Sequence, residues 1–135
     1  MLARIQQALT LSLLAVALAW LVHFWPGSPG MALGGFALIV FGYAGFLAVE
    51  FVALKRINSA QPGGAASWGQ LARAWVGETI TAPRVFCWRQ PFRWNAEPDH
   101  LDGAALRGRR GVVLVHGFVC NRGLWTPWLR RLRQQ

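Results

Sequence analysis

Two apolar stretches decide the architecture of this chain: IQQALTLSLLAVALAWLVHF, from Ile5 to Phe24, and MALGGFALIVFGYAGFLAVEFVAL, from Met31 to Leu54. Both reach the roughly 20 residues that a helix needs to cross the hydrocarbon layer of a bilayer. The segment between them, WPGSPG, contains two prolines and two glycines, which interrupt a continuous helix. The sequence therefore predicts a hairpin of two membrane-spanning helices.

The composition also favours a membrane protein. Hydrophobic residues make up 54% of the 135 residues and charged residues 14%, whereas soluble domains carry roughly 25% charged residues. The formal net charge of +9 suits either nucleic acid or an anionic lipid surface. Nearly all of the basic residues follow the hydrophobic half and are scattered, with no nucleic-acid-binding motif beside them. We therefore expect the lipid bilayer as the partner and expect no nucleic acid.

Positive charges predict the orientation of the hairpin. Arg4 precedes the first span, Lys55 and Arg56 follow the second, and the loop between the spans carries no charge. Because positively charged flanks stay in the cytoplasm, we expect two spans with both termini cytoplasmic, in a membrane such as the bacterial inner membrane. A cleaved signal peptide stays open as an alternative, because Ala17-Leu18-Ala19 resembles its small-residue cleavage site.

The domain boundaries follow from a change in composition after the second span. We expect a transmembrane hairpin over residues 1–57, a flexible linker over the small-residue stretch 58–66, and a soluble segment over 67–135. Ser67 with Gln70 predicts a capping box at the start of a helix that ends at Pro83. The shared helical face of Trp68, Leu71 and Trp75 suits either a membrane surface or packing against the rest of the domain.

The segments after that helix predict short extended structure and loops. Arg84–Trp94 is aromatic and rich in residues that favour strands, but Pro91 interrupts it, so we expect a short edge strand. Asp99, His100 and Asp102 lie close together but lack the spacing of a metal site, so an exposed loop is expected, without metal or cofactor. The two cysteines, Cys87 and Cys120, are expected to be unpaired thiols.

The sequence GVVLVHG, Gly111 to Gly117, predicts a buried strand over Val112–Val115 that ends in a His-Gly pair. A loop, Phe118–Gly123, then leads to an expected helix over Leu124–Leu132. The stretch RGVVLVHGFVCNRGLW resembles the oxyanion-loop segment of lipase- and esterase-like α/β-hydrolases. This resemblance implies a membrane α-helical hairpin followed by the start of an α/β-hydrolase domain, which is incomplete.

The resemblance also implies roles for three residues. The backbone N–H of Phe118 would help to hold the oxyanion of a tetrahedral intermediate, while His116 and Gly117 would shape the loop. The nucleophile motif Gly-x-Ser-x-Gly and the later acid and base are absent from the chain. We therefore expect the N-terminal part of a membrane-anchored serine ester hydrolase, truncated before the nucleophile and inactive as it stands, whose full-length relative acts on an ester or other acyl substrate. The alternative is a non-catalytic two-span membrane protein that acts as an anchor or interaction module.

Overall fold

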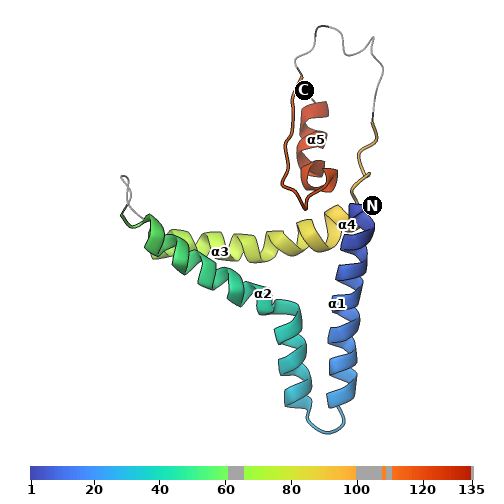
Figure 1. Ribbon diagram of the computed structural model, residues 1–135, viewed down its shortest axis with the longest axis vertical. Coiled ribbons are helices and arrows are strands. Elements are labelled where there is room, and N and C mark those ends of the chain that lie inside the picture. The colour runs from blue at the N-terminus through green and yellow to red at the C-terminus, as the bar shows by residue number, and fades with distance from the viewer. Residues whose placement is uncertain (61–65, 100–107, 109–110, 135) are drawn as a thin grey trace. The chain divides into compact units, whose positions relative to one another are not determined.

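The computed structural model describes residues 1–60, 66–99, 108 and 111–134. These residues form helices, turns and irregular segments, and none of them lies in a β-strand. The chain divides into two compact units, one formed by Ala8–Pro83 and the other by Met1–Gln7 together with Arg84–Gln135. Figure 1 shows the helices α1 to α5 in chain order. The expected α/β domain start is therefore wrong, because the described part of residues 67–135 supplies no strands to build a sheet.

The two long apolar helices confirm the predicted helical hairpin. Helix α1 covers Leu2–Phe24 and helix α2 covers Pro29–Asn58, so both extend beyond the predicted spans. Ser28 caps α2, because its hydroxyl accepts a hydrogen bond from the Met31 N–H at 3.4 Å. By length and composition both helices could cross a membrane.

Helix α3, Trp68–Ala82, begins with the predicted capping box. The Ser67 hydroxyl accepts from the Gln70 N–H at 3.2 Å, and the Gln70 side chain accepts from the Ser67 N–H at 2.7 Å. This reciprocal pair satisfies two backbone donors that the first turn of a helix leaves free. The predicted start of α3 is therefore confirmed.

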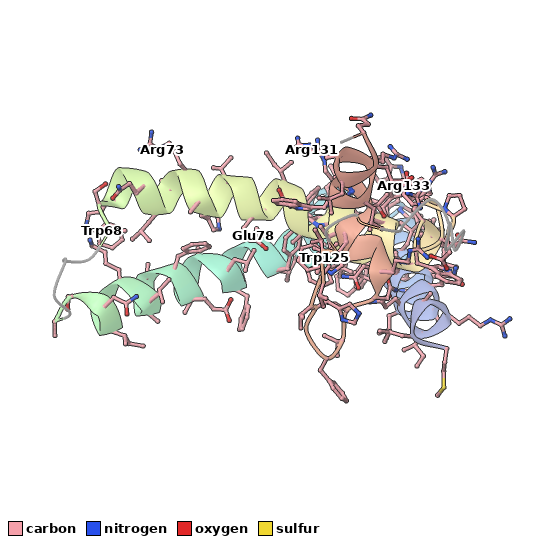
Figure 2. The ribbon with its side chains drawn as sticks, turned by 90° about the horizontal axis from the view of Figure 1, so that it is seen from above. Trp68, Arg73, Glu78, Trp125, Arg131 and Arg133 are labelled. Carbon is pink, nitrogen blue, oxygen red and sulfur yellow. The ribbon has the colours of Figure 1, made fainter. Side chains whose placement is uncertain are left out.

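The apolar face of α3 packs on α2, which was neither of the two surfaces expected for it. Leu71 is buried, and the Trp75 Nε1 donates to the Ala44 carbonyl at 2.8 Å. Figure 1 shows α2 bending near its middle, with α3 beside its C-terminal half. The Trp75 hydrogen bond falls at Ala44, in this middle part of α2 and next to Gly45. In Figure 2, Arg73 lies on the side of α3 that faces away from α2.

A proline and a tyrosine explain how the chain leaves α3. Pro83 has no N–H, so it cannot donate the helical hydrogen bond to the Thr79 carbonyl four residues earlier. The Tyr43 hydroxyl donates to that carbonyl instead, at 2.6 Å. The helical path then continues as a π-helix over Pro83–Arg89 and a short helix α4 over Gln90–Phe92. The edge strand expected over Arg84–Trp94 is therefore wrong, because those residues continue a helix that was already formed.

We expect Tyr43→Phe to lower the free energy of unfolding by about 0.5–1.5 kcal/mol, the usual net contribution of one hydrogen bond. Chemical unfolding of the purified chain would measure it. Pro83→Ala is the matched background, because alanine restores the N–H that can reach Thr79. In that background Tyr43→Phe should lower the free energy of unfolding by a smaller amount. Equal costs in the two backgrounds would show that the hydroxyl does not replace the missing donor.

The C-terminal part of the described chain is an extended segment followed by helix. Residues 111–117 have no regular structure, and Val113 and Val115 are 86% and 79% exposed. The buried strand expected over Val112–Val115 is thus wrong, because β-branched residues form a strand only where a neighbouring strand pairs with them. The helix expected after it is confirmed as a 3-10 turn over Arg122–Trp125 and helix α5 over Thr126–Arg133.

Candidate functional site

A buried glutamine organises the unit that contains residues 1–7 and 84–134. Gln90 is fully buried, and its side-chain oxygen accepts hydrogen bonds from the Asn121 N–H at 2.8 Å and from the Gln6 side chain at 3.1 Å. The Asn121 side chain donates in turn to the Gln90 carbonyl at 2.9 Å and to the Gln6 side chain at 2.8 Å. We call Gln6, Gln90 and Asn121 the amide network. It joins the first turns of α1, the start of α4 and the loop before α5.

Two further contacts hold the same three segments together. The Gln7 side chain donates to the Pro91 carbonyl at 2.7 Å, and Gly123 packs so closely on Arg89 that a Cβ would lie 2.6 Å from the Arg89 carbonyl oxygen. The Gly123 N–H is in turn bonded to the Asn121 side chain at 2.8 Å. Because buried amides are costly unless they are hydrogen-bonded, this arrangement defines one position for the loop on α4.

A second polar group surrounds Glu97, whose side chain is only 12% exposed. Arg130 and Arg133 of α5 both pair with the Glu97 carboxylate, Arg133 at 2.9 Å. Arg122 donates to the Glu97 carbonyl and pairs with Asp99 at 2.5 Å. The Arg130 hydrogen bond, with the charges of Arg133 and Arg122, holds the pKa of Glu97 below its ordinary value. We call Glu97, Arg122, Arg130 and Arg133 the Glu97 cluster.

The Glu97 cluster makes the docking of α5 sensitive to acid. A carboxyl whose pKa is lowered in the folded chain binds fewer protons there than in the unfolded chain, so its stabilisation is present above the ordinary pKa of 4.5 and is lost as the pH falls through the lowered value. We expect hydrogen exchange of the α5 amides to accelerate between pH 5 and pH 3 relative to the intrinsic rate. Glu97→Gln should remove most of that pH dependence. An unchanged acid response in Glu97→Gln would assign it to other groups.

Sequence reasoning missed both polar groups and singled out other residues. Asp99 is exposed as expected and pairs with Arg122, while His100 and Asp102 lie outside the described residues. In the described ranges no three His, Cys, Asp or Glu side chains gather as a metal site would require. Cys87 and Cys120 are unpaired thiols in the structure, Cys87 exposed and Cys120 half-buried. The spacing of the arginines in α5 was the available signal for the Glu97 cluster, since residues 130 and 133 share one helical face.

The residues given an oxyanion-loop role lie in an exposed turn. The Cys120 N–H donates to the Gly117 carbonyl at 3.0 Å, which closes the turn, and His116 Nδ1 lies 3.0 Å from the same carbonyl oxygen. The Phe118 side chain is fully exposed. The side chains of His116 and Phe118 take no part in the amide network.

A shallow apolar groove lies in the other unit, between α2 and α3. It has a volume of about 140 Å³ and its lining is apolar: Ala48, Phe51, Val52, Trp68, Leu71, Ala72 and Trp75. The Lys55 ammonium lies 5.1 Å from the centre of the Trp68 ring, a cation–π distance. The groove is therefore the seam between the two packed helices, and Lys55 lies against one of its lining tryptophans.

The resemblance to α/β-hydrolases does not survive these observations. That fold begins with strands, and the described residues on either side of His116 and Gly117 form helices or unpaired extended chain. Comparison of the chain with protein-family models, with curated proteins and with solved structures found no match. The predicted membership of the α/β-hydrolase superfamily is therefore wrong.

Proposed function

We propose that the chain is a non-catalytic two-span membrane protein that anchors a small basic module, residues 84–134, at the surface of a bilayer. The observation that supports this proposal most directly is the outward-facing apolar surface of α1 and α2. Leu9, Val22 and Leu38 are 65%, 71% and 71% exposed. Soluble monomers rarely expose an apolar surface of that extent, whereas lipid would cover it.

The lengths of the helices agree with this proposal. Helix α1 has 23 residues and α2 has 30, and at a rise of about 1.5 Å per residue they measure about 35 and 45 Å. The hydrocarbon core of a bilayer is about 30 Å thick, so each helix is long enough to cross it. The core helix of a soluble protein would be mostly buried, but 6% of the apolar window of α1 and none of that of α2 is buried.

The orientation is proposed from the flanking charges. Arg4 lies at the start of α1, and Lys55 and Arg56 lie in the last turn of α2. Positive charges on both outer flanks, with an uncharged connection, favour a cytoplasmic location for both ends of the hairpin. The partner that we propose is the bilayer itself, and a bacterial inner membrane would supply the anionic lipids that suit a net charge of +9.

Reporter fusions test the topology. We expect alkaline phosphatase, which is active only outside the cytoplasm, to be inactive when fused after Ala66 and active when fused after Ser28. A cytoplasmic reporter at the same two positions should give the opposite pattern, which controls for expression. Higher phosphatase activity at Ala66 than at Ser28 would contradict the hairpin and support the signal-peptide alternative.

Two further measurements separate this proposal from its competitors. The chain should stay in the membrane pellet after alkaline carbonate extraction, which removes proteins that only adhere to a membrane.

The non-catalytic part of the proposal predicts no labelling by a fluorophosphonate probe, which reacts with activated serines. Labelling of any serine in the chain would contradict that part and leave the anchor intact.

A further inference from the structure

We propose that the exposed side of Pro83–Trp94 binds the phosphate headgroups of an anionic phospholipid surface. The residues concerned are Arg84, Trp88, Phe92 and Arg93, which we call the Trp88 stripe. In a π-helix, residues four or five positions apart lie on the same side, and Arg84 and Trp88 have that spacing within Pro83–Arg89. The Trp88 and Phe92 rings lie 5.8 Å apart between their centres, which confirms their shared side.

Three residues of the Trp88 stripe are exposed and Phe92 is half-buried, while other residues of the same segment are buried. Trp88 is 58% exposed, and Arg84 and Arg93 are exposed. By contrast, Val85 is 5% exposed and Gln90 is fully buried. The segment therefore has an anchored side and a free side, and the free side combines aromatic rings with guanidinium groups.

The anchored side places the segment beside the end of α1. Gln7 donates to the Pro91 carbonyl at 2.7 Å, and Gln6 donates to the Gln90 side chain at 3.1 Å. Primary amides are costly in hydrocarbon, so an α1 that crosses the bilayer would place Gln6 and Gln7 at the edge of the hydrocarbon layer. This step rests on the proposed membrane function. If α1 spans the bilayer, these hydrogen bonds tie the segment to the end of α1 that reaches the headgroups.

The chemistry of the stripe matches that layer. Tryptophan favours the membrane interface, where its ring is partly desolvated and its N–H stays hydrated. Arginine forms paired hydrogen bonds with phosphate oxygens. Residues 83–96 contain no Asp or Glu, and in the described part of the chain the carboxylate ion pairs go to Arg122, Arg130 and Arg133. The guanidinium groups of Arg84 and Arg93 thus have no carboxylate partner among these pairs.

An anionic lipid surface fits better than an acidic protein partner. The surface is continuous with the bilayer that would cover α1 and α2, so the stripe would meet it without a separate association step. The aromatic residues would also contribute to binding there, whereas an acidic peptide would use the arginines alone. A protein partner is therefore an outcome that the test must distinguish.

The exposed Cys87 allows a direct test in the full chain. In a Cys120→Ser background, Cys87 is labelled with an environment-sensitive fluorophore, and the protein is reconstituted into vesicles of phosphatidylcholine alone or mixed with phosphatidylglycerol. We expect the label to be shielded from aqueous iodide and quenched by brominated lipid in the mixed vesicles, and less so in phosphatidylcholine. A label on Cys120 in a Cys87→Ser background serves as the matched probe and should respond equally in both.

Charge variants complete the test. Each of Arg84→Gln and Arg93→Gln should lower the ratio of shielded to exposed label by roughly fivefold in mixed vesicles, the effect of one basic residue near an anionic surface. Arg131→Gln, which removes the same charge from α5, should leave the ratio unchanged. Equal shielding in both kinds of vesicle, or equal effects of all three variants, would overturn the lipid proposal.

The experiment separates this inference from the proposed function. If the chain is removed from vesicles by alkaline carbonate, the membrane anchor itself is contradicted. If it stays in the vesicles but the Cys87 label remains open to iodide in both compositions, the anchor stands and the Trp88 stripe does not bind lipid. Shielding that appears only when cytoplasmic extract is added would assign the stripe to a protein partner and overturn the inference.

Discussion

Replacing Gly123 with alanine should detach the loop before α5 from α4 and cost about 1–3 kcal/mol of stability, the usual range for overpacking a tight contact. A Cβ at Gly123 would lie 2.6 Å from the Arg89 carbonyl oxygen and 2.8 Å from the Gln90 Cα. Both atoms belong to the backbone of a helical segment, so neither can move aside by a change of rotamer. We expect the upper part of the range for this reason.

The measurement is hydrogen exchange of the amides of residues 121–133, compared with those of α3. In Gly123→Ala the former should lose protection while the latter keep it, because α3 belongs to the other unit. Gly117→Ala is the matched control. Its Cβ would meet only the Cys120 Sγ, at 3.9 Å, which is ordinary contact. Equal loss of protection in the two variants would mean that the close approach at Gly123 does not position the loop.

The parts of this fold that could be predicted from sequence are those with local causes. The apolar stretches gave α1 and α2, because length and hydropathy alone define them. Ser67 and Gln70 gave the start of α3, since a capping box is complete within four residues. Helix α5 followed from the pattern of apolar and basic residues after Gly123.

The failures have causes that are distant in sequence. The aromatic, strand-favouring composition of Arg84–Trp94 predicts a strand, but the helix before it continues through Pro83. That continuation uses the Tyr43 hydroxyl, which reaches Thr79 from 36 residues away. Similarly, Val112–Val115 has the composition of a buried strand, and the described chain offers it no strand to pair with. Strand propensity expresses a fit to neighbours, and the neighbours were not predictable.

The amide network was missed for a related reason. Gln6 and Gln90 are 84 residues apart, and Gln6 and Asn121 are 115 apart. Glutamine and asparagine have no characteristic spacing of the kind that marks a metal site or a catalytic motif. Only the folded chain shows that Gln6 and Asn121 are hydrogen-bonded to each other and to Gln90. The resemblance to a hydrolase loop was misleading because it rests on a short local motif. The α/β-hydrolase fold depends on strands that are distant in sequence, and a short motif does not supply them.

The second large effect is expected at the contact between α1 and α2. The Trp20 ring lies directly over Gly35, and a Cβ there would be 1.9 Å from Nε1 and 2.2 Å from Cε2 of that ring. Gly35→Ala therefore requires the indole to leave. It would then lose its hydrogen bond to the Met31 carbonyl, which is 3.1 Å long. Because overpacking a tight contact usually costs about 1–3 kcal/mol, we expect a loss of that size at the contact between Trp20 and Gly35.

Denaturant unfolding in detergent micelles, followed by the helical circular dichroism signal, would measure this loss. Gly34→Ala is the adjacent control, since a Cβ at Gly34 would meet nothing within 4 Å. Trp20→Ala supplies the second arm of a double-mutant cycle. Once the indole is absent, Gly35→Ala should cost little, so the two substitutions together should destabilise the chain by no more than Trp20→Ala alone. If the two losses in free energy of unfolding add instead, Gly35→Ala acts on the backbone conformation of α2. Trp20 would then not hold the two helices together.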